Sequence, residues 1–120
     1  NLLNSLAHRT TWLRSDFWQS FTGKEITYGG NDGEIYFEED DFDRFVDRLG
    51  KLEGIEYVHK PVEHRWGQRV VRFYDPDRHI IEVGENIKTV CQRFLDSGMT
   101  PEEVAARMDV PLKAVKAYMR

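Results

Sequence analysis

A β-hairpin is predicted at residues 66–85, WGQRVVRFYDPDRHIIEVGE, and it constrains the fold more than any other part of the chain. Residues 70–74 and 79–83 are rich in β-branched and aromatic side chains, which favour strands. The segment YDPDR between them places a proline between two aspartates, residue types that favour tight turns. We therefore expect two antiparallel strands joined by this turn.

The second strand of this hairpin carries a carboxylate on the face opposite its apolar pair. Successive side chains of a strand point to opposite faces, so Glu82 points away from Ile81 and Val83. A strand expected at residues 34–38 shows the same alternation. If these strands join one sheet, its polar and aromatic face contains Glu34, Tyr36, Arg72, Tyr74 and Glu82.

A helix expected at residues 40–52 would cover the apolar face of the sheet. Its apolar residues follow helical spacing and form a single stripe, which comprises Phe42, Phe45, Val46, Leu49 and Leu52. Three aspartates crowd its start, where carboxylates satisfy free backbone N–H groups and interact favourably with the helix dipole. We interpret this acidic run as structural. The next strand is expected at residues 56–63, and Pro61 predicts that it is an edge strand or is bulged.

The hairpin resembles the closing hairpin of the vicinal oxygen chelate superfamily, which contains glyoxalases, bleomycin-resistance proteins and extradiol dioxygenases. In that superfamily a DPDG-like turn precedes a strand that ends in a hydrophobic–Glu–hydrophobic triplet, and this chain has DPDR and then IEV. Residues 33–49, GEIYFEEDDFDRFVDRL, look like the strand and helix that open the same module. Arg78 stands where the superfamily usually has glycine, which leaves the turn geometry open. The resemblance implies an α+β fold of βαβββ half-barrel modules of glyoxalase/bleomycin-resistance type, with a C-terminal helical extension.

The resemblance also implies a metal site on the concave, polar face of the sheet. Metal ligands of the superfamily lie on the first and last strands of each module, and these positions correspond to Glu34 and Glu82. His8 corresponds to the ligand on the last strand of a preceding module, of which this chain has only a part. By resemblance, a divalent metal ion of unknown identity would chelate two adjacent oxygens of a small substrate. Glu82 would be catalytic and would move a proton.

Other interpretations of the same face remain open. It could be an ordinary solvated sheet face. It could also bind a drug-sized molecule without metal, as in bleomycin-resistance proteins, with Trp12, Tyr36 and Tyr74 stacking on the ligand and Arg72 as a further contact. Trp12 could equally belong to the core, with the other aromatic residues of a helix expected at residues 10–21. The sequence does not decide whether the chain is an enzyme, and a metal-dependent lyase or a dioxygenase are the candidates.

Length and composition fit one compact domain, with 120 residues of which 40% are hydrophobic. No apolar run of about 18 residues and no signal-peptide pattern is present, so neither membrane insertion nor export is indicated. The single cysteine, Cys91, fits a reducing compartment, and we expect a cytoplasmic location. Motifs for a nucleophilic serine, a phosphate-binding loop, a dinucleotide site or a CxxC pair are missing.

Charge divides the chain into two parts. Residues 1–85 contain 11 basic and 17 acidic residues, whereas residues 86–120 contain 6 basic and 4 acidic residues. We therefore expect a glyoxalase-like body at residues 1–85, with an incomplete first module, and a helical extension at residues 86–120. The acidic balance of the body argues against nucleic acid as its partner.

The end of the chain, SGMTPEEVAARMDVPLKAVKAYMR, looks like a helix-turn-helix. Thr100, Pro101 and Glu103 form an N-cap, a first-turn proline and a capping-box acceptor. Asp109 occupies the position where such turns usually have glycine. DNA binding through basic residues of the second helix is one alternative, but we favour a helical pair packed on the body or at a homodimer interface. A nucleic-acid partner is accordingly not expected.

Overall fold

The computed structural model describes residues 20, 23–25, 30–31 and 33–120. The strand expected at residues 6–8 lies outside the described residues, as does nearly all of the helix expected at residues 10–21. His8 and Trp12 therefore lie outside the described residues as well. Among the described residues, no helix combines the length and apolar character needed to cross a membrane.

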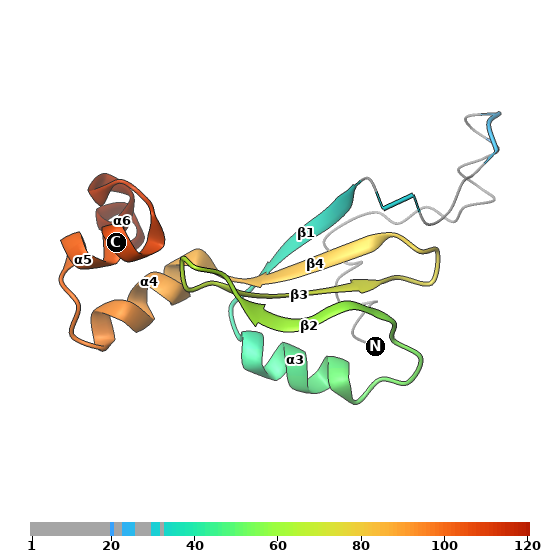
Figure 1. The fold of residues 1–120 in the computed structure, drawn as a ribbon, viewed down its shortest axis with the longest axis horizontal. Coiled ribbons are helices and arrows are strands. Elements are labelled where there is room, and N and C mark those ends of the chain that lie inside the picture. Colours follow the sequence, from blue (N-terminus) through green and yellow to red (C-terminus); the bar gives the residue numbers. More distant parts are fainter. Residues whose placement is uncertain (1–19, 21–22, 26–29, 32) are drawn as a thin grey trace.

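The body is a βαβββ module whose elements run in the order β1 (Glu34–Glu39), α3 (Phe42–Gly50), β2 (Tyr57–Glu63), β3 (Arg69–Tyr74) and β4 (Ile80–Glu85). In the sheet the strand order is β1-β4-β3-β2, with β1 parallel to β4 and the other neighbours antiparallel (Figure 1). This topology confirms the predicted α+β fold and the predicted hairpin, which joins β3 to β4.

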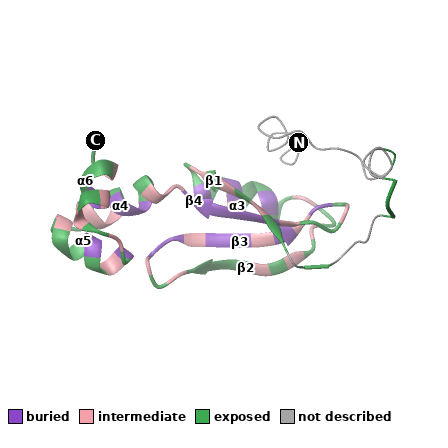
Figure 2. Cartoon of the chain, turned by 90° about the horizontal axis from the view of Figure 1, so that it is seen from above, coloured by how far each residue is buried: buried purple, intermediate pink, exposed green. Residues whose placement is uncertain are grey.

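Helix α3 packs on one face of the sheet, and the core of the body lies between them (Figure 1). Buried residues gather on the central strands β3 and β4 (Figure 2). The core contains the predicted apolar residues of the helix and strands: Phe42, Phe45, Leu49, Val71, Phe73, Ile81 and Val83. Because strand side chains alternate, burial of this face leaves the polar residues between them on the opposite, concave face.

The start of α3 and the β3–β4 turn each depend on a single residue. The side chain of Asp41 caps α3 by accepting a hydrogen bond from the backbone N–H of Arg44, which confirms the structural role of that part of the acidic run. In the β3–β4 turn, Arg78 adopts the left-handed conformation with φ of 67°, the conformation for which the superfamily's glycine is suited. Its guanidinium lies 4.1 Å from the ring centroid of Tyr74 and pairs with Glu56, contacts that a glycine could not make.

Strand β2 forms one edge of the sheet, as Pro61 predicts. Its register against β3 shifts twice, between Tyr57 and His59 and between His59 and Val62. The two shifts flank His59, and the second one contains Pro61, which has no N–H to donate to the ladder. Side chains therefore do not alternate regularly along β2, and the sequence does not show on which face of the sheet each of them lies.

The C-terminal extension is a three-helix unit that consists of α4 (Ile87–Asp96), α5 (Pro101–Met108) and α6 (Leu112–Tyr118) (Figure 1). Its own core contains Val90, Cys91, Val104, Ala105, Met108 and Val115. The predicted capping box at the start of α5 is confirmed. We expected the last two helices to need the body or another subunit to bury their apolar stripes, whereas α4 supplies this surface.

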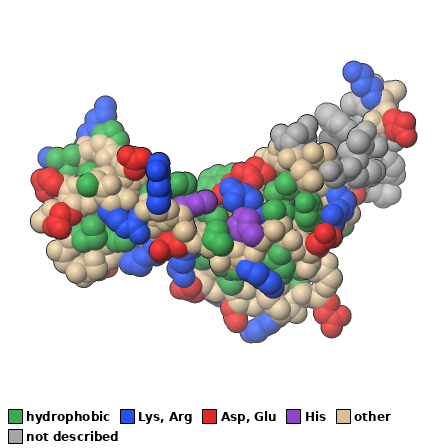
Figure 3. All heavy atoms as spheres, in the orientation of Figure 1, with side chains coloured by type: hydrophobic (Ala, Val, Ile, Leu, Met, Phe, Trp, Pro, Cys, Tyr) green, Lys and Arg blue, Asp and Glu red, His purple; other side chains and the backbone are tan. Residues whose placement is uncertain are grey.

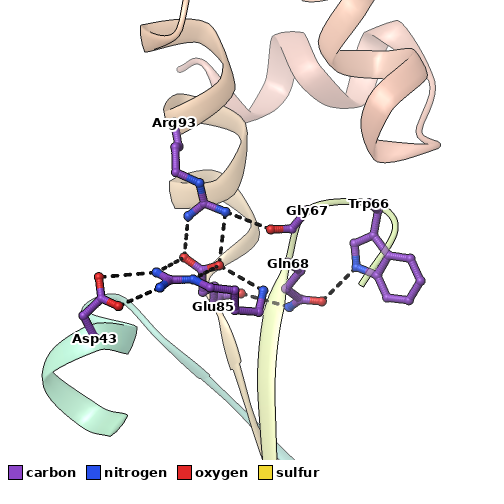
Figure 4. A network of polar contacts seen from close by, with 7 residues as sticks. Asp43, Trp66, Gly67, Gln68, Glu85 and Arg93 are labelled. Carbon is purple, nitrogen blue, oxygen red and sulfur yellow. Dashed lines mark hydrogen bonds and ion pairs between the residues drawn. The ribbon is translucent and has the colours of Figure 1, made fainter. Parts of the chain in front are cut away.

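A buried carboxylate joins the body to the three-helix unit (Figure 4). The side chain of Glu85, at the end of β4, is 2% exposed and forms ion pairs with Arg69 of β3 at 3.0 Å and with Arg93 of α4 at 2.6 Å. Arg69 also pairs with Asp43 of α3 at 2.6 Å, and Arg93 donates to the carbonyl oxygen of Gly67 at 2.8 Å. One carboxylate therefore links two strands and, through its arginines, two helices.

We predict that Glu85 makes the folded state sensitive to acid. Burial alone would raise the pKa of this carboxyl, but the hydrogen bonds from Arg69 and Arg93 outweigh burial and lower the pKa to about 2. Because the folded pKa lies below the unfolded value of about 4.5, the stabilisation exists above that value and is lost as the pH falls towards 2. Glu85→Gln should destabilise the protein at pH 7 by about 3 kcal/mol and should flatten its stability between pH 4.5 and 2. Urea unfolding at several pH values measures both effects, and an unchanged acid limb in the variant would contradict the assignment.

A second prediction concerns the contact between the β2–β3 turn and α4. Gly67 has φ of 86°, and a Cβ there would lie 2.3 Å from Cζ of Phe94. Gly54 has φ of 77° but no atom within 4 Å of the corresponding position, so it is the matched control. Both alanine variants should lose about 1 kcal/mol from the left-handed backbone. Gly67→Ala should lose about 1–3 kcal/mol more by displacing Phe94. Thermal unfolding compares them, and equal losses would be the contrary result.

Candidate functional site

The predicted polar face exists, and a single arginine lies at its centre. Arg72 of β3 stands opposite Glu82 of β4 in the antiparallel ladder, and Tyr36 of β1 stands beside Glu82 on the other side. The guanidinium of Arg72 is held by Glu34 Oε2 at 2.8 Å from Nε and by Glu82 Oε1 at 2.9 Å from Nη2. Acidic, basic and histidine side chains accordingly meet over the sheet in the space-filling view (Figure 3).

His59 of β2 completes this cluster, at a position that the sequence pattern does not predict. Its Nε2 lies 3.0 Å from Nη1 of Arg72, and its Nδ1 lies 2.8 Å from the carbonyl oxygen of Lys60. Since the carbonyl only accepts and the guanidinium only donates, Nδ1 carries the proton and Nε2 accepts from Arg72. The imidazole is therefore neutral in this arrangement. Register shifts on both sides of His59 conceal its position opposite Arg72, so strand alternation does not predict this contact.

The two glutamates of the cluster interact and differ in acidity. Burial raises the pKa of Glu82 to about 7, the hydrogen bond with Glu34 adds to this rise, and Arg72 opposes it. The pKa of Glu34 is lowered, mainly by the hydrogen bond with Glu82 and further by Arg72, against the effect of its own burial. The pair titrates together, so one proton is shared between the two carboxyl groups near neutral pH. Such a group can both donate and accept a proton under physiological conditions.

The buried side-chain amide of Gln68 holds Tyr36 in position. Gln68 of the β2–β3 turn donates from Nε2 to the hydroxyl oxygen of Tyr36 at 3.0 Å and to the backbone carbonyl of Glu85 at 2.9 Å. The indole N–H of Trp66 donates to Gln68 Oε1 at 3.0 Å (Figure 4). These three contacts fix the amide, and the ring of Tyr36 remains 46% exposed on the concave face. Gln68 is a second residue that the sequence did not single out, because its role depends on contacts between distant segments.

Tyr74 lies apart from the Arg72 cluster. Its hydroxyl donates to Asn31 Oδ1 at 3.0 Å, and Arg78 covers its ring. It lines a cavity of about 350 Å³ at the β3–β4 turn, together with residues 53–56, 75, 76 and 78. Within the described residues, no hydrogen bond joins Tyr74 to Arg72, Glu34 or Glu82. The five predicted residues therefore share one face, but only Glu34, Arg72 and Glu82 are paired with one another, and Tyr36 and Tyr74 make their hydrogen bonds elsewhere.

The donor set suits a divalent cation only in part. Two carboxylates and an imidazole are ligand types that such ions take. All three side chains, however, form hydrogen bonds or ion pairs with the guanidinium of Arg72, which occupies the position between them. Among the described residues, no group of three His, Cys, Asp or Glu side chains lies close enough to hold a metal ion. A metal ion could use Glu34 and Glu82 here only by displacing Arg72.

Comparison with known proteins identifies the fold family. Residues 8–88 match the family model of the glyoxalase-like domain, which is more than half of the chain. The chain belongs to this family. It is thus a member of the vicinal oxygen chelate superfamily, as the hairpin and the βαβββ topology indicated. No curated protein matches this glyoxalase-like chain significantly.

Solved structures resemble parts of this glyoxalase-like chain. A protein of unknown function from Agrobacterium tumefaciens str. C58 is 34% identical, with a TM-score of 0.50 over 60% of this chain and 57% of that chain. The fosfomycin resistance protein FosX from Mesorhizobium loti is also 34% identical, with a TM-score of 0.38 over 47% of this chain and 46% of that chain. A member of the glyoxalase/bleomycin resistance protein/dioxygenase superfamily from Sphaerobacter thermophilus DSM 20745 is 28% identical, with a TM-score of 0.40 over 52% and 46% of the two chains. The matches span about half the length of these proteins.

We predict that two substitutions shift the pKa of Glu82 in opposite directions. Glu34→Gln should lower the pKa of Glu82 below 7, because Glu34 raises it. Arg72→Gln should raise the same pKa, because Arg72 opposes the rise. Carbon-detected NMR of the glutamate carboxyl groups across a pH titration follows each variant. Shifts in the same direction in both variants would show that the cluster is not arranged as described.

Proposed function

We propose that the concave face binds a small, neutral molecule that carries a hydroxyl group next to a carbonyl group. The observation that supports this most is the position of Arg72 between Glu34 and Glu82, because the cluster offers hydrogen-bond donors and acceptors side by side. A carbonyl oxygen can accept from the guanidinium while the adjacent hydroxyl donates to a carboxylate. The paired carboxylates disfavour an anionic ligand, since like charges repel at this distance.

The proposed chemistry at this site is proton transfer. Glu82, with a pKa of about 7, would take a proton from the carbon or hydroxyl beside the ligand carbonyl and return it elsewhere. Arg72 would stabilise the negative charge that develops on the carbonyl oxygen. Burial of Glu82, which is 8% exposed, strengthens both effects because little water competes. The reaction class would be that of a glyoxalase-like lyase or isomerase.

Aromatic residues and a second subunit would complete the ligand site. Tyr36 would form one wall, with its hydroxyl held by Gln68. Trp12 and Tyr74 remain proposed contacts of a larger ligand. Among the helices and strands that the structure describes, none packs on the concave face, so we also propose that a homodimer encloses it, as symmetric pairing of two identical half-barrels would do.

The second candidate is metal-dependent chemistry of a lyase or dioxygenase, and the approach of Glu34 to Glu82 favours it. In that case Glu34 and Glu82 would hold a divalent ion, His8 would be a further ligand, and Arg72 would have moved aside. The metal would supply a Lewis acid for the carbonyl oxygen of the ligand. As a ligand of the ion, Glu82 would not be free to act as a separate proton carrier.

One variant separates the two candidates, since Arg72 has opposite roles in them. For the metal-free site, Arg72→Gln should weaken binding of 2-hydroxyacetophenone roughly 10-fold or more, because a charged hydrogen bond is lost. For the metal site, the same variant should bind zinc or manganese at least as well as the native protein, whereas Glu82→Gln should bind it roughly 10-fold more weakly. NMR titration with the ketone and calorimetric titration with the metal salts measure these affinities.

A control ligand and a measurement of metal content accompany these titrations. Acetophenone, which lacks the hydroxyl group, should bind more weakly than 2-hydroxyacetophenone if the carboxylates recognise that group. Metal content of protein purified without chelator shows which form the native protein takes. Equal affinity for the two ketones, together with native affinity in Arg72→Gln, would contradict the metal-free proposal. Loss of metal binding in Arg72→Gln but not in Glu82→Gln would contradict the metal proposal.

A further inference from the structure

The three-helix unit has the construction of a nucleic-acid-binding helix-turn-helix. Helices α5 and α6 are joined by a turn of three residues, in which Asp109 takes the left-handed conformation with φ of 58°. The backbone N–H of Val110 closes the turn on the carbonyl oxygen of Ala105 at 3.1 Å. Two helices linked by a turn of this length, packed on a third helix, form the motif that places its second helix against duplex DNA. Here the second helix is α6.

Helix α6 separates its apolar and basic residues. Val115 is fully buried in the core of the unit, and Leu112 packs beside it. Lys113, Lys116 and Arg120 follow one another at helical spacing of three and four residues, and all three are exposed. No acidic residue occurs from Pro111 to the end of the sequence. Within the part of the chain that the structure describes, none of these three cations belongs to an ion pair.

We propose that the basic face formed by Lys113, Lys116 and Ala117 of α6 and by Arg120, two residues beyond the end of α6, contacts the phosphates of duplex DNA. The small side chain of Ala117 lies between the cations and allows the helix backbone to approach closely. An anionic membrane surface is less suited, since a helix that binds membranes offers a large apolar face to the lipid. The apolar face of α6 is already buried against α4 and α5. Lys and Arg side chains project from this end of the molecule in the space-filling view (Figure 3).

The surrounding charges limit the strength of this contact. Glu102 and Glu103 are exposed at the start of α5, and the body carries more acidic than basic residues. Asp109 lies beside α6 but pairs with Arg65 at 3.6 Å, which partly neutralises it. From the sequence we favoured packing of the last two helices over DNA binding, but their apolar residues are buried against α4, and the basic residues of α6 remain exposed. This inference is independent of the ligand site on the concave face.

Fluorescence anisotropy of a labelled, mixed-sequence DNA duplex tests the proposal on the full chain. With three phosphate contacts, the affinity should fall about 40-fold as the salt concentration rises from about 50 to about 200 mM. The triple variant Lys113→Ala, Lys116→Ala and Arg120→Ala should weaken binding at the lower salt concentration roughly 10-fold or more. Circular dichroism checks that this surface variant remains folded.

The triple variant Arg44→Ala, Arg48→Ala and Lys51→Ala is the matched control. It removes the same charge from exposed positions of α3 and of its C-cap residue, Lys51, on the body. Duplex affinity within about 2-fold of the native value in this control, with loss in the α6 variant, supports the proposal. Equal loss in both variants, or no duplex binding at the lower salt concentration, overturns it. Binding to vesicles that contain anionic lipid, without binding to the duplex, would also overturn it and assign the face to a membrane surface.

Discussion

The arrangement of this protein depends on one buried carboxylate. Glu85 ends β4 and precedes α4, so its side chain lies where the sheet gives way to the three-helix unit. A buried carboxylate is tolerated only when it is well paired, and Arg69 and Arg93 both pair with it. Because these arginines come from β3 and α4, the orientation of the extension relative to the sheet follows from the need to neutralise one charge.

The cluster on the concave face also pairs a central charge with groups of opposite charge, but there the central charge is positive. There one arginine, Arg72, is held by two carboxylates and a neutral imidazole. Gln68 lies between the two centres, since its amide donates to the carbonyl oxygen of Glu85 and to Tyr36 on the concave face. Gln68 therefore contacts both the residue that pairs with α4 and the aromatic wall of the proposed ligand site.

The sequence predicts the elements that depend on short-range patterns. Strand alternation placed Glu34, Tyr36, Arg72 and Glu82 on one face, and the caps of α3 and α5 were readable from single residues. The position of His59 was not readable, because a register shift on each side of it breaks the alternation on which such a prediction depends. Gln68 was missed for a different reason, since its partners lie at distances of 17 and 32 residues in the sequence. The predicted division at residues 85 and 86, the roles of His8 and Trp12, and the cytoplasmic location stay predictions.

The irregular edge strand β2 bears on how copies of this protein can associate. An edge strand with a regular row of free N–H and C=O groups invites another chain to extend the sheet. Pro61 removes one N–H from β2, and the register shifts on either side of His59 disturb the spacing of the rest. Continuous sheet extension through β2 is therefore disfavoured. Strand β2 therefore exposes Val58 and Val62 to solvent without becoming a template for aggregation.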